Sequence, residues 1–485
     1  MKHLPNAMNW INGAWCDSAN RTPSINPATG ELIGSFADAT LADAKRAVAA
    51  ARDAFLHSPW RDDRSLRARA LNVIADRFED RAEELAQMLA TENGKILPEA
   101  RFEVFTVAPK LRYCSALALS QHGRALEVRP SAYSMALCQP IGVAGLIVPW
   151  NSPVVLLMRS LGPALAAGTT VVAKMPGQTA QVNALVAQIL SEIAELPPGV
   201  VNIFSESGIS GSAFLVESPD VPVISFTGST RTGRAIAAAG ASRLKRFGLE
   251  LGGKTPMIVF NDADLATALP QLEKAITVFA GQFCMAGSRI LAERGIADRL
   301  RQALGARLDQ LRVGPASDPR SEMGPLIDRQ SVARVDAMVE KALAEGAQPI
   351  VRGGIAREPA LAAGAFYRPT LLEVSDANLA IVQEEVFGPV ATFQVFEGEA
   401  EAIALANNSD FGLAASVWSR DVDRPLRVAR ELQVGAVWIN DWAAIHDEFE
   451  EGGFKQSGIG RLNGLASLHD FQETKHIALR AGGLQ

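Results

Sequence analysis

The sequence predicts an α/β fold in which a doubly wound parallel sheet is joined to a second α/β region. With 485 residues the chain is too long for one hydrophobic core, so we expect two or three domains. Short β-branched runs alternate with helix-like runs through residues 142–240, which is the pattern of a parallel sheet covered by helices. A second mixture of strand-like and helix-like runs follows Lys254.

The N-terminal part of the chain supplies further elements. Residues 1–40 contain short strand-like runs broken by turn-forming pairs such as Asn12-Gly13. Alanine-rich helical periodicity follows over residues 43–90, and a second helix-like run covers residues 98–120. We expect these helices to pack on the sheet.

Residues 127–139 alternate apolar and polar side chains around Pro130-Ser131 and predict a hairpin. A free two-stranded ribbon is marginally stable in water, so the hairpin needs a surface to pack against. We expect that surface to belong to a partner subunit; the alternative is an edge hairpin docked on its own domain. Residues 475–480 alternate in the same way and predict one more strand.

The central strands are expected to end at the residues that carry chemistry. Strands are predicted at residues 142–148, 169–173, 200–204, 223–226 and 436–439, and helices up to 165, up to 193, after 233, and over 295–310 and 330–345. Doubly wound sheets bind ligands at the carboxyl ends of their strands. We therefore expect a nucleotide at this edge of the sheet.

The composition restricts the possible partners. Hydrophobic residues make up 48% of the chain and charged residues 21%, which is usual for a globular enzyme. The net charge of -6 argues against nucleic acid or an anionic membrane as partner. Four scattered cysteines and six dispersed histidines indicate a reducing, cytoplasmic setting without a metal site. The N-terminus lacks the apolar segment of a signal peptide and is expected to be mature sequence.

Cys284 is the candidate nucleophile. It lies among small residues in the stretch Gly281 to Arg289, which leaves its sulfur accessible. The alternative is a buried cysteine that acts as a small hydrophobic residue. Glu250, between two leucines, is a candidate general base because apolar surroundings raise a carboxyl pKa. Asn151 offers a neutral N–H donor for an oxyanion, although asparagine after a strand is also an ordinary turn residue.

Six motifs together resemble the aldehyde dehydrogenase superfamily over nearly the whole chain. They are Pro149-Trp150-Asn151, Phe226-Thr227-Gly228-Ser229, Leu249-Glu250-Leu251-Gly252-Gly253-Lys254, Gly281-Gln282-Phe283-Cys284, Glu384-Glu385-Val386-Phe387-Gly388-Pro389 and Lys455-Gln456-Ser457-Gly458. The resemblance implies that Cys284 forms a thiohemiacetal and then a thioester with an aldehyde. It also implies that Asn151 stabilises the oxyanion and that Glu250 activates water to release a carboxylic acid.

The same resemblance implies a cofactor, a domain division and an assembly. The cofactor is NAD or NADP, and its implied binding residues are Pro149, Trp150, Lys174, Gly177, Thr227, Gly228, Ser229, Leu251, Gly252, Glu385 and Phe387. The implied domains are a Rossmann-like dinucleotide-binding domain (1–121 and 141–250), a catalytic domain (251–462) and oligomerisation strands (122–140 and 463–485). A homodimer or homotetramer is expected.

Two departures from the family pattern affect these expectations. Gly177 stands where many relatives have a glutamate that binds the adenosine ribose, so the preference between NAD and NADP stays open. Residues 447–451 form an acidic run where relatives have Pro-Phe. This run could favour a cationic substrate, but we interpret it as a solvated loop.

Arg159 is the main clue to the substrate. It follows Asn151 by two helical turns and is expected to reach the aldehyde entrance with Val155, beside the small Ser152. We expect an aromatic aldehyde; a carboxylated semialdehyde is the alternative, and Arg159 could also pair with a structural acid. A CoA-acylating relative or a non-catalytic relative fits less well, because Glu250, Asn151 and Cys284 are all present.

Overall fold

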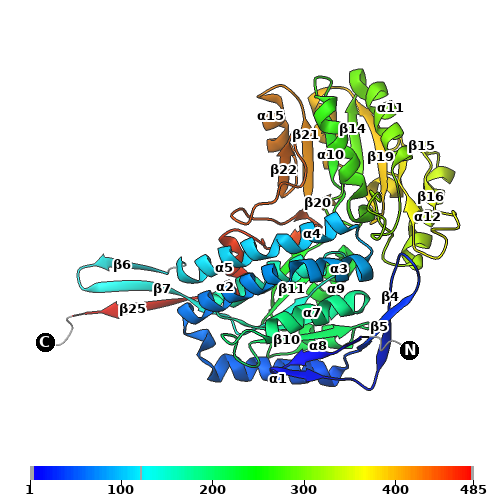
Figure 1. The fold of residues 1–485 in the computed structure, drawn as a ribbon. Helices are drawn as coiled ribbons and strands as arrows, with labels where there is room; N and C mark the ends of the chain where they lie inside the picture. The colour runs from blue at the N-terminus through cyan, green and yellow to red at the C-terminus, as the bar shows by residue number, and fades with distance from the viewer. Residues whose placement is uncertain (1–4, 121–122, 482–485) are drawn as a thin grey trace.

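The computed structural model describes residues 5–120 and 123–481, and two large sheets organise the chain (Figure 1). The first sheet has eight strands in the order β24-β12-β11-β8-β9-β10-β2-β3. Their bounds are β24 (Gly458–Ile459), β12 (Arg246–Glu250), β11 (Val223–Thr227), β8 (Val143–Ile147), β9 (Thr170–Pro176), β10 (Val201–Glu206), β2 (Asn9–Ile11) and β3 (Ala14–Cys16). Strands β12, β11, β8, β9 and β10 are parallel, which confirms the predicted doubly wound sheet.

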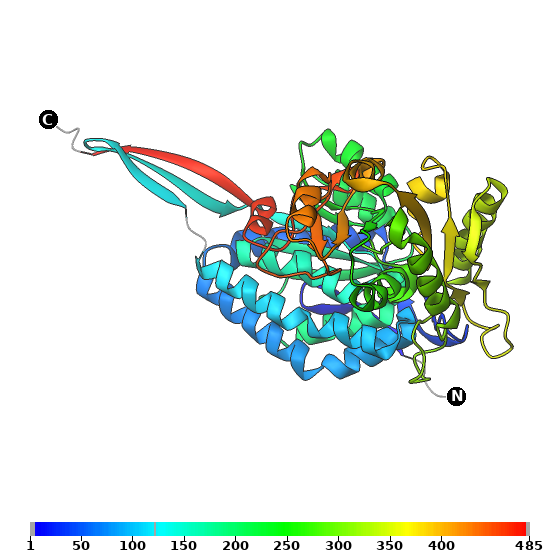
Figure 2. The ribbon, with the colours of Figure 1, turned by 90° about the horizontal axis from the view of Figure 1, so that it is seen from above.

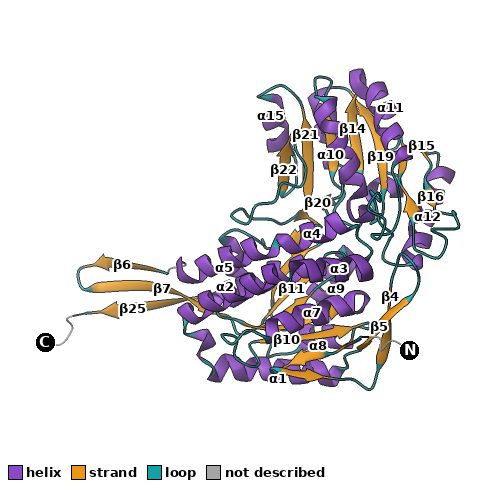
Figure 3. Cartoon of the chain, viewed as in Figure 1, coloured by secondary structure: helices purple, strands orange, loops and turns teal. Residues whose placement is uncertain are grey.

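Helices cover both faces of this sheet because alternate strand residues point to opposite sides. On one side lie α2 (Arg64–Asp80), α3 (Ala82–Asn93), α4 (Leu97–Phe105), α5 (Val107–Ser120), α6 (Pro153–Ala167) and α7 (Ala180–Ser191), and on the other α1 (Leu41–His57), α8 (Ser210–Glu217) and α9 (Thr230–Ala241). Val171 and Ala173 of β9 pack in the first core, whereas Val172 packs in the second. Figure 3 shows the strands between these helices.

The second sheet has seven strands in the order β15-β18-β19-β14-β13-β21-β22. Their bounds are β15 (Gln348–Val351), β18 (Thr370–Glu373), β19 (Val390–Phe396), β14 (Arg289–Glu293), β13 (Pro256–Val259), β21 (Ala414–Trp418) and β22 (Ala436–Ile439). The flanking helices include α10 (Leu265–Thr277), α11 (Arg294–Gln310), α12 (Arg329–Ala344), α13 (Ala380–Gln383), α14 (Gly398–Asn407) and α15 (Arg424–Glu431). Short strand pieces complete the fold: β1 (Asn6–Ala7), β4 (Arg21–Ile25), β5 (Leu32–Ala37), β16 (Gly354–Ile355), β17 (Tyr367–Arg368), β20 (Phe411–Gly412) and β23 (Phe454–Lys455).

A three-stranded ribbon projects from the body of the protein (Figures 1 and 2). It consists of β6 (Arg124–Arg129), β7 (Ala132–Pro140) and β25 (Gln472–Arg480), with β7 in the centre. The predicted hairpin and the predicted last strand are therefore confirmed, and they pair with each other. Because the ribbon points outward, it is not an edge hairpin docked on its own domain. The expected boundary between residues 121 and 122 falls outside the described residues.

The helical region after residue 40 is more divided than the sequence predicts. Residues 43–90 contain parts of three helices, because a 3-10 turn over Pro59–Arg61 follows α1 and Arg81 separates α2 from α3. Ser58 ends α1, and its hydroxyl accepts a hydrogen bond from the Trp60 N–H at the start of the turn. Residues 98–120 form two helices, α4 and α5, that meet at Thr106.

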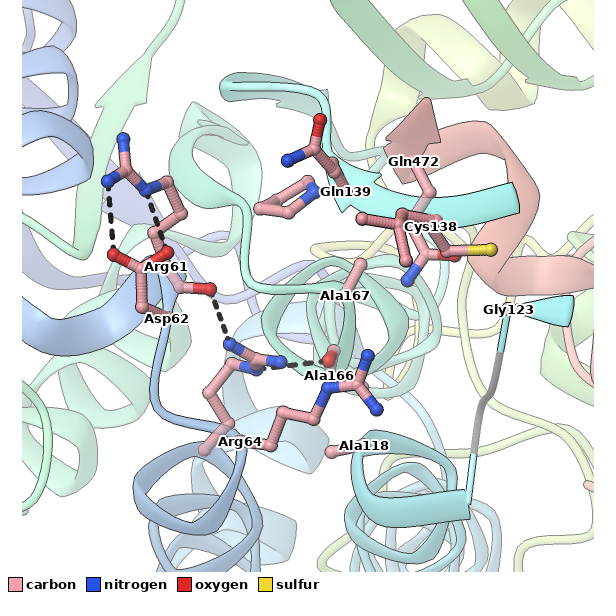
Figure 4. Close-up of a pocket in the computed structure, with 13 residues that line it drawn as sticks. Arg61, Asp62, Arg64, Ala118, Gly123, Cys138, Gln139, Ala166, Ala167 and Gln472 are labelled. Carbon is pink, nitrogen blue, oxygen red and sulfur yellow. Dashed lines mark hydrogen bonds and ion pairs between the residues drawn. The ribbon is translucent and has the colours of Figure 1, made fainter. Parts of the chain in front are cut away.

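A pocket of about 230 Å³ lies where the ribbon joins the body (Figure 4). Its cations already have partners: Arg61 forms two hydrogen bonds with Asp62, and the Arg67 guanidinium donates to backbone carbonyls, including that of Ala166. None of the candidate site residues lines this pocket. Across residues 5–120 and 123–481, no group of acidic, histidine or cysteine side chains is arranged to hold a metal ion. In the same ranges, no helix has the length and apolar character that crossing a bilayer requires.

Candidate active site

The parallel strands of the first sheet bring several candidate residues to one edge. Glu250 is the last residue of β12 and lies in register with Thr227, the last residue of β11. The Gly228 N–H donates to the Glu250 carbonyl at 3.0 Å, which fixes the start of the turn before α9. Lys174 lies near the end of β9, paired with Ile147 of β8. The predicted convergence at the carboxyl ends of the strands is thus present.

A buried segment after Glu250 connects the two sheets and contacts three other parts of the chain. A Cβ on Gly252 would lie 2.5 Å from a carboxylate oxygen of Glu385, and a Cβ on Gly253 would lie 2.3 Å from the Cys284 carbonyl oxygen. The Ser457 hydroxyl donates to the Gly252 carbonyl at 2.7 Å. The approach at Gly253 requires glycine because the Cys284 carbonyl belongs to the backbone, whereas the flexible Glu385 side chain packs closely on Gly252 and Ser457 binds the Gly252 carbonyl.

The loop before Cys284 has an unusual backbone. Phe279, Ala280 and Gly281 have φ angles of 52°, 53° and 71°, which are strained for the two residues that carry a Cβ. The Phe279 N–H donates to a carboxylate oxygen of Glu99 at 2.9 Å, which holds the loop in this shape. The loop carries Cys284, which is partly exposed as a whole residue while its thiol lies in buried surroundings.

Asn151 reaches this loop from the start of α6. Its side-chain amide donates to the Gln282 carbonyl at 3.1 Å, two residues before the cysteine. The amide is buried, and its donor lies close to the backbone that precedes Cys284. The structure therefore brings Cys284, Glu250 and Asn151 to the same region from three separate segments.

Burial controls the protonation of both ionisable candidates. It raises the pKa of Glu250 to about 8, although the positive charge of Arg159 opposes this shift. Burial also raises the pKa of Cys284 to about 12, and Arg159 again opposes the shift. Chemically, the arrangement can supply a sulfur nucleophile, a neutral N–H donor and a carboxyl group that exchanges protons near neutral pH.

Several candidate cofactor residues are arranged in a way that fits a dinucleotide. Ser229 caps α9, whose first N–H groups form an anion site suited to a pyrophosphate. Trp150 and Phe387 lie edge to face with ring centroids 5.5 Å apart, and Glu385 accepts the Gly253 N–H at 3.2 Å. The Lys174 ammonium forms no hydrogen bond or ion pair within the described residues, so it has donors to offer a ligand.

The other candidate cofactor residues lie close by. Leu251 directly follows the end of β12, and Pro149 lies two residues after the end of β8. Gly177 is buried at the start of a 3-10 turn after β9, where a Cβ would lie 2.9 Å from the Phe36 ring. A longer side chain such as glutamate at this position would have to displace the Phe36 ring.

Arg159 does not present a free guanidinium to the entrance. Its Nη1 lies 3.0 Å from a carboxylate oxygen of Glu451, and both side chains are only 7% exposed. The interpretation of residues 447–451 as a solvated loop is wrong for Glu451, which is buried, and for Asp447, which pairs with Lys110. Glu451 is thus a site residue that the sequence interpretation missed; its position directly before Gly452-Gly453, a pair that needs close packing, was the available signal.

Ser152 and Val155 are also held by buried polar neighbours. The Ser152 hydroxyl accepts from the Lys95 ammonium at 2.9 Å, and Lys95 pairs with Glu103. The Val155 N–H donates to Glu103 at 3.3 Å. Ser152 therefore belongs to a buried polar cluster with Lys95 and Glu103.

Comparisons with known proteins identify the family to which this chain belongs. The sequence model of the Aldehyde dehydrogenase family matches residues 15–477. Betaine aldehyde dehydrogenase from Bacillus subtilis is 38% identical over 472 residues, covering 96% of each chain, and human mitochondrial aldehyde dehydrogenase is 38% identical, covering 97% of this chain and 91% of that protein. This chain belongs to the aldehyde dehydrogenase family, which confirms the resemblance inferred from its motifs.

Solved structures agree with this assignment. A crystal structure of betaine aldehyde dehydrogenase from Staphylococcus aureus, in complex with NAD+, superposes with a TM-score of 0.97. The two sequences are 36% identical, and the match covers 100% of this chain and 97% of that one. The predicted combination of a Rossmann-like sheet, a second α/β sheet and a projecting ribbon is therefore confirmed.

The loop geometry yields a test of how the cysteine is positioned. In Gly281→Ala, a Cβ would meet the Gly388 carbonyl carbon at 2.2 Å, at a φ angle that alanine rarely adopts. We expect aldehyde oxidation to fall at least about tenfold, because a displacement near 1 Å at a reacting group costs on this scale or more. Gly208→Ala, where a Cβ meets nothing within 4 Å, is the matched control and should keep wild-type activity. Equal activity in both variants would show that the Gly281 backbone does not position Cys284.

Proposed function

We propose that the protein oxidises an aldehyde to a carboxylic acid, with Cys284 as nucleophile, Asn151 as oxyanion donor and Glu250 as general base. The observation that carries this proposal is the convergence of the three residues from the start of α6, the end of β12 and the loop after α10. Family membership supports the reaction class.

The first half of the reaction forms a bond to sulfur. The Cys284 thiol, whose pKa burial raises to about 12, first gives its proton to solvent, and the resulting thiolate attacks the carbonyl carbon while the electron pair of the C=O bond moves to oxygen. Asn151 Nδ2–H, which reaches the backbone just before Cys284, and the Cys284 N–H would donate to this oxyanion. A bound nicotinamide supplies the hydride acceptor that lets the C=O bond re-form as a thioester. Lys174, Ser229 and Glu385 would hold that cofactor.

The second half releases the acid. Glu250 takes a proton from a water molecule as the water oxygen attacks the thioester carbon. The C–S bond then breaks, and Cys284 leaves as a thiolate while the carboxylic acid departs. A carboxyl group with a pKa of about 8 suits this task, because it both accepts and releases a proton near physiological pH.

We further propose an aliphatic aldehyde as the substrate. The argument from Arg159 for an aromatic or a carboxylated aldehyde loses its basis, because Glu451 already neutralises the guanidinium. Phe283, next to the nucleophile, lies edge to face with both Phe279 and Trp442, with centroids 5.8 Å apart in each pair. An aromatic side chain beside the nucleophile would suit an alkyl chain or an alkylammonium end of the aldehyde. Relatives named betaine aldehyde dehydrogenase support this class.

The projecting ribbon supports the proposal of a homodimer or homotetramer. Leu126, Val128 and Leu479 expose 65%, 53% and 53% of their surface on it. Exposed apolar side chains on a narrow ribbon favour burial against another protein surface. A second copy of this chain is the partner that the family resemblance implies, with residues 122–140 and 463–485 as the contact.

Removing the base should separate the two halves of the reaction. In Glu250→Gln we expect a burst of reduced cofactor close to one per active site, followed by a steady rate at least about a hundredfold slower than wild type. Wild-type turnover should rise as pH passes through about 8, since Glu250 acts in its ionised form. Stopped-flow absorbance at 340 nm measures both phases, and Cys284→Ala is the control without a burst. A Glu250→Gln enzyme with wild-type steady turnover would exclude Glu250 as the base.

A substrate panel tests the aliphatic proposal. We expect kcat/KM for betaine aldehyde and for propanal to exceed that for benzaldehyde and succinic semialdehyde by about tenfold or more, since a partnered Arg159 offers nothing to a carboxylate. Initial rates with each aldehyde at saturating cofactor give the comparison. A preference for benzaldehyde or for succinic semialdehyde would overturn the proposal.

The cofactor preference has its own test. Gly177 presents no carboxylate to repel a 2′-phosphate, so we expect measurable activity with NADP as well as with NAD. The ratio of kcat/KM for the two cofactors, with propanal fixed, is the measurement. Activity with NAD alone would mean that another group, such as Asp38 or Glu206 near Lys174, excludes the phosphate.

A further inference from the structure

The ion pair between Arg159 and Glu451 joins two walls of the active site. Arg159 lies on α6, the helix whose start holds Asn151 against the cysteine loop. Glu451 directly precedes Gly452, and a Cβ on Gly452 would lie 3.1 Å from a Glu250 carboxylate oxygen. The pair therefore links the helix that positions the oxyanion donor to the loop that contacts the candidate base.

The Arg159–Glu451 ion pair belongs to a larger network of buried polar side chains. The carboxylate oxygen of Glu451 that binds Arg159 also accepts from the Asn463 amide at 3.1 Å. The side-chain amide oxygen of Asn463 accepts a hydrogen bond from the Lys110 ammonium at 2.9 Å, and Lys110 forms an ion pair with Asp447. Glu451 is thus held from a second direction, which fixes the position of the Arg159 charge.

Stability alone does not explain this arrangement. Arg159 Nε and the other Glu451 oxygen are buried and have no hydrogen-bond partner within residues 5–120 and 123–481. Unpaired buried polar atoms cost folding free energy, and buried ion pairs can often be replaced by apolar residues without loss. Because apolar residues can often stabilise a fold at least as well as a buried charged pair, the presence of this pair beside the site indicates a role in the chemistry.

We propose that Arg159 and Glu451 are a positioning pair that sets the charge balance over Cys284 and Glu250, with the arginine favouring both ionised forms and Glu451 limiting its effect. The inference deepens the proposed function and rests on it for the role of Glu250. The part that concerns Cys284 is tested without any aldehyde or cofactor, and its geometric support is the Asn151 amide at the start of α6, which holds the Gln282 carbonyl two residues before Cys284.

The charges that face the two groups give the sign of each effect. Around Cys284, Arg159 is the cation that favours the thiolate, and the carboxylates of Glu451, Glu385 and Glu250 oppose it. Around Glu250, the cations are Arg159 and Arg461, and the acids are Glu451 and Asp470. Removing Arg159 should therefore raise the pKa of both groups, and removing the charge of Glu451 should lower both.

The experiment measures the pH dependence of Cys284 alkylation by iodoacetamide, followed by peptide mass spectrometry on the full-length protein. We expect the Arg159→Met profile to move to higher pH and the Glu451→Gln profile to lower pH, each by roughly one unit. The double variant Arg159→Met/Glu451→Gln should return close to wild type, and Arg159→Lys should stay near wild type. Shifts in the same direction in both single variants, or no shift in either, would overturn the proposal.

A second readout separates this inference from the proposed function. Arg461→Met is the matched control, because Arg461 faces Glu250 and is not among the charges that act most strongly on Cys284. It should move the pH profile of steady aldehyde turnover and leave the alkylation profile unchanged. If the alkylation shifts occur but no variant oxidises aldehydes, the pair stands and the proposed function fails. If Arg159→Met does not fold, Glu451→Gln still gives the sign of one charge, and a double variant far from wild type would contradict the pair.

Discussion

The close approach of backbones at Gly252 and Gly253 is the constraint on which the active site depends. This pair lies between Glu250, the last residue of β12 in one sheet, and β13, the first strand of the other sheet along the chain, so it also joins the two halves of the fold. Side chains larger than hydrogen would collide with Glu385 and with the carbonyl of Cys284. Because the loop of Cys284 and the segment of Glu385 both pack against these two glycines, Cys284 and Glu385 come close to Glu250, although the three residues belong to separate parts of the chain.

The same close packing makes the charges in the site sensitive to small changes. Burial pulls the pKa of Lys254 down to about 7 and pushes those of Glu250 and Glu385 up to about 8 and about 7. Groups that titrate near neutral pH respond strongly to one neighbouring charge. The Arg159–Glu451 pair can therefore change the pKa values of Cys284 and Glu250. A unit charge in a low-dielectric interior changes the proton affinity of its neighbours far more than the same charge on the surface would.

The sequence predicted those features that depend on neighbouring residues. The alternation of strands and helices after residue 142 and the hairpin around Pro130-Ser131 follow from local periodicity and turn chemistry, and the structure has both. Contacts between distant residues could not be found in this way. Arg159 and Glu451 are 292 positions apart, and Lys110 and Asp447 are 337 apart, so local polarity made the acidic run look solvated. The family motifs identified Cys284, Glu250 and Asn151, but only the fold shows which partner neutralises Arg159.

The central claim is that Cys284 carries the substrate as a thioester which Glu250 hydrolyses. The most direct measurement is mass spectrometry of Glu250→Gln quenched in acid seconds after mixing with propanal and NAD. We expect a propanoyl mass increment on the peptide that contains Cys284, and none on the peptides of Cys16, Cys114 or Cys138. An enzyme that reduces its cofactor without any acyl group on Cys284, or with the group on another cysteine, would contradict this account.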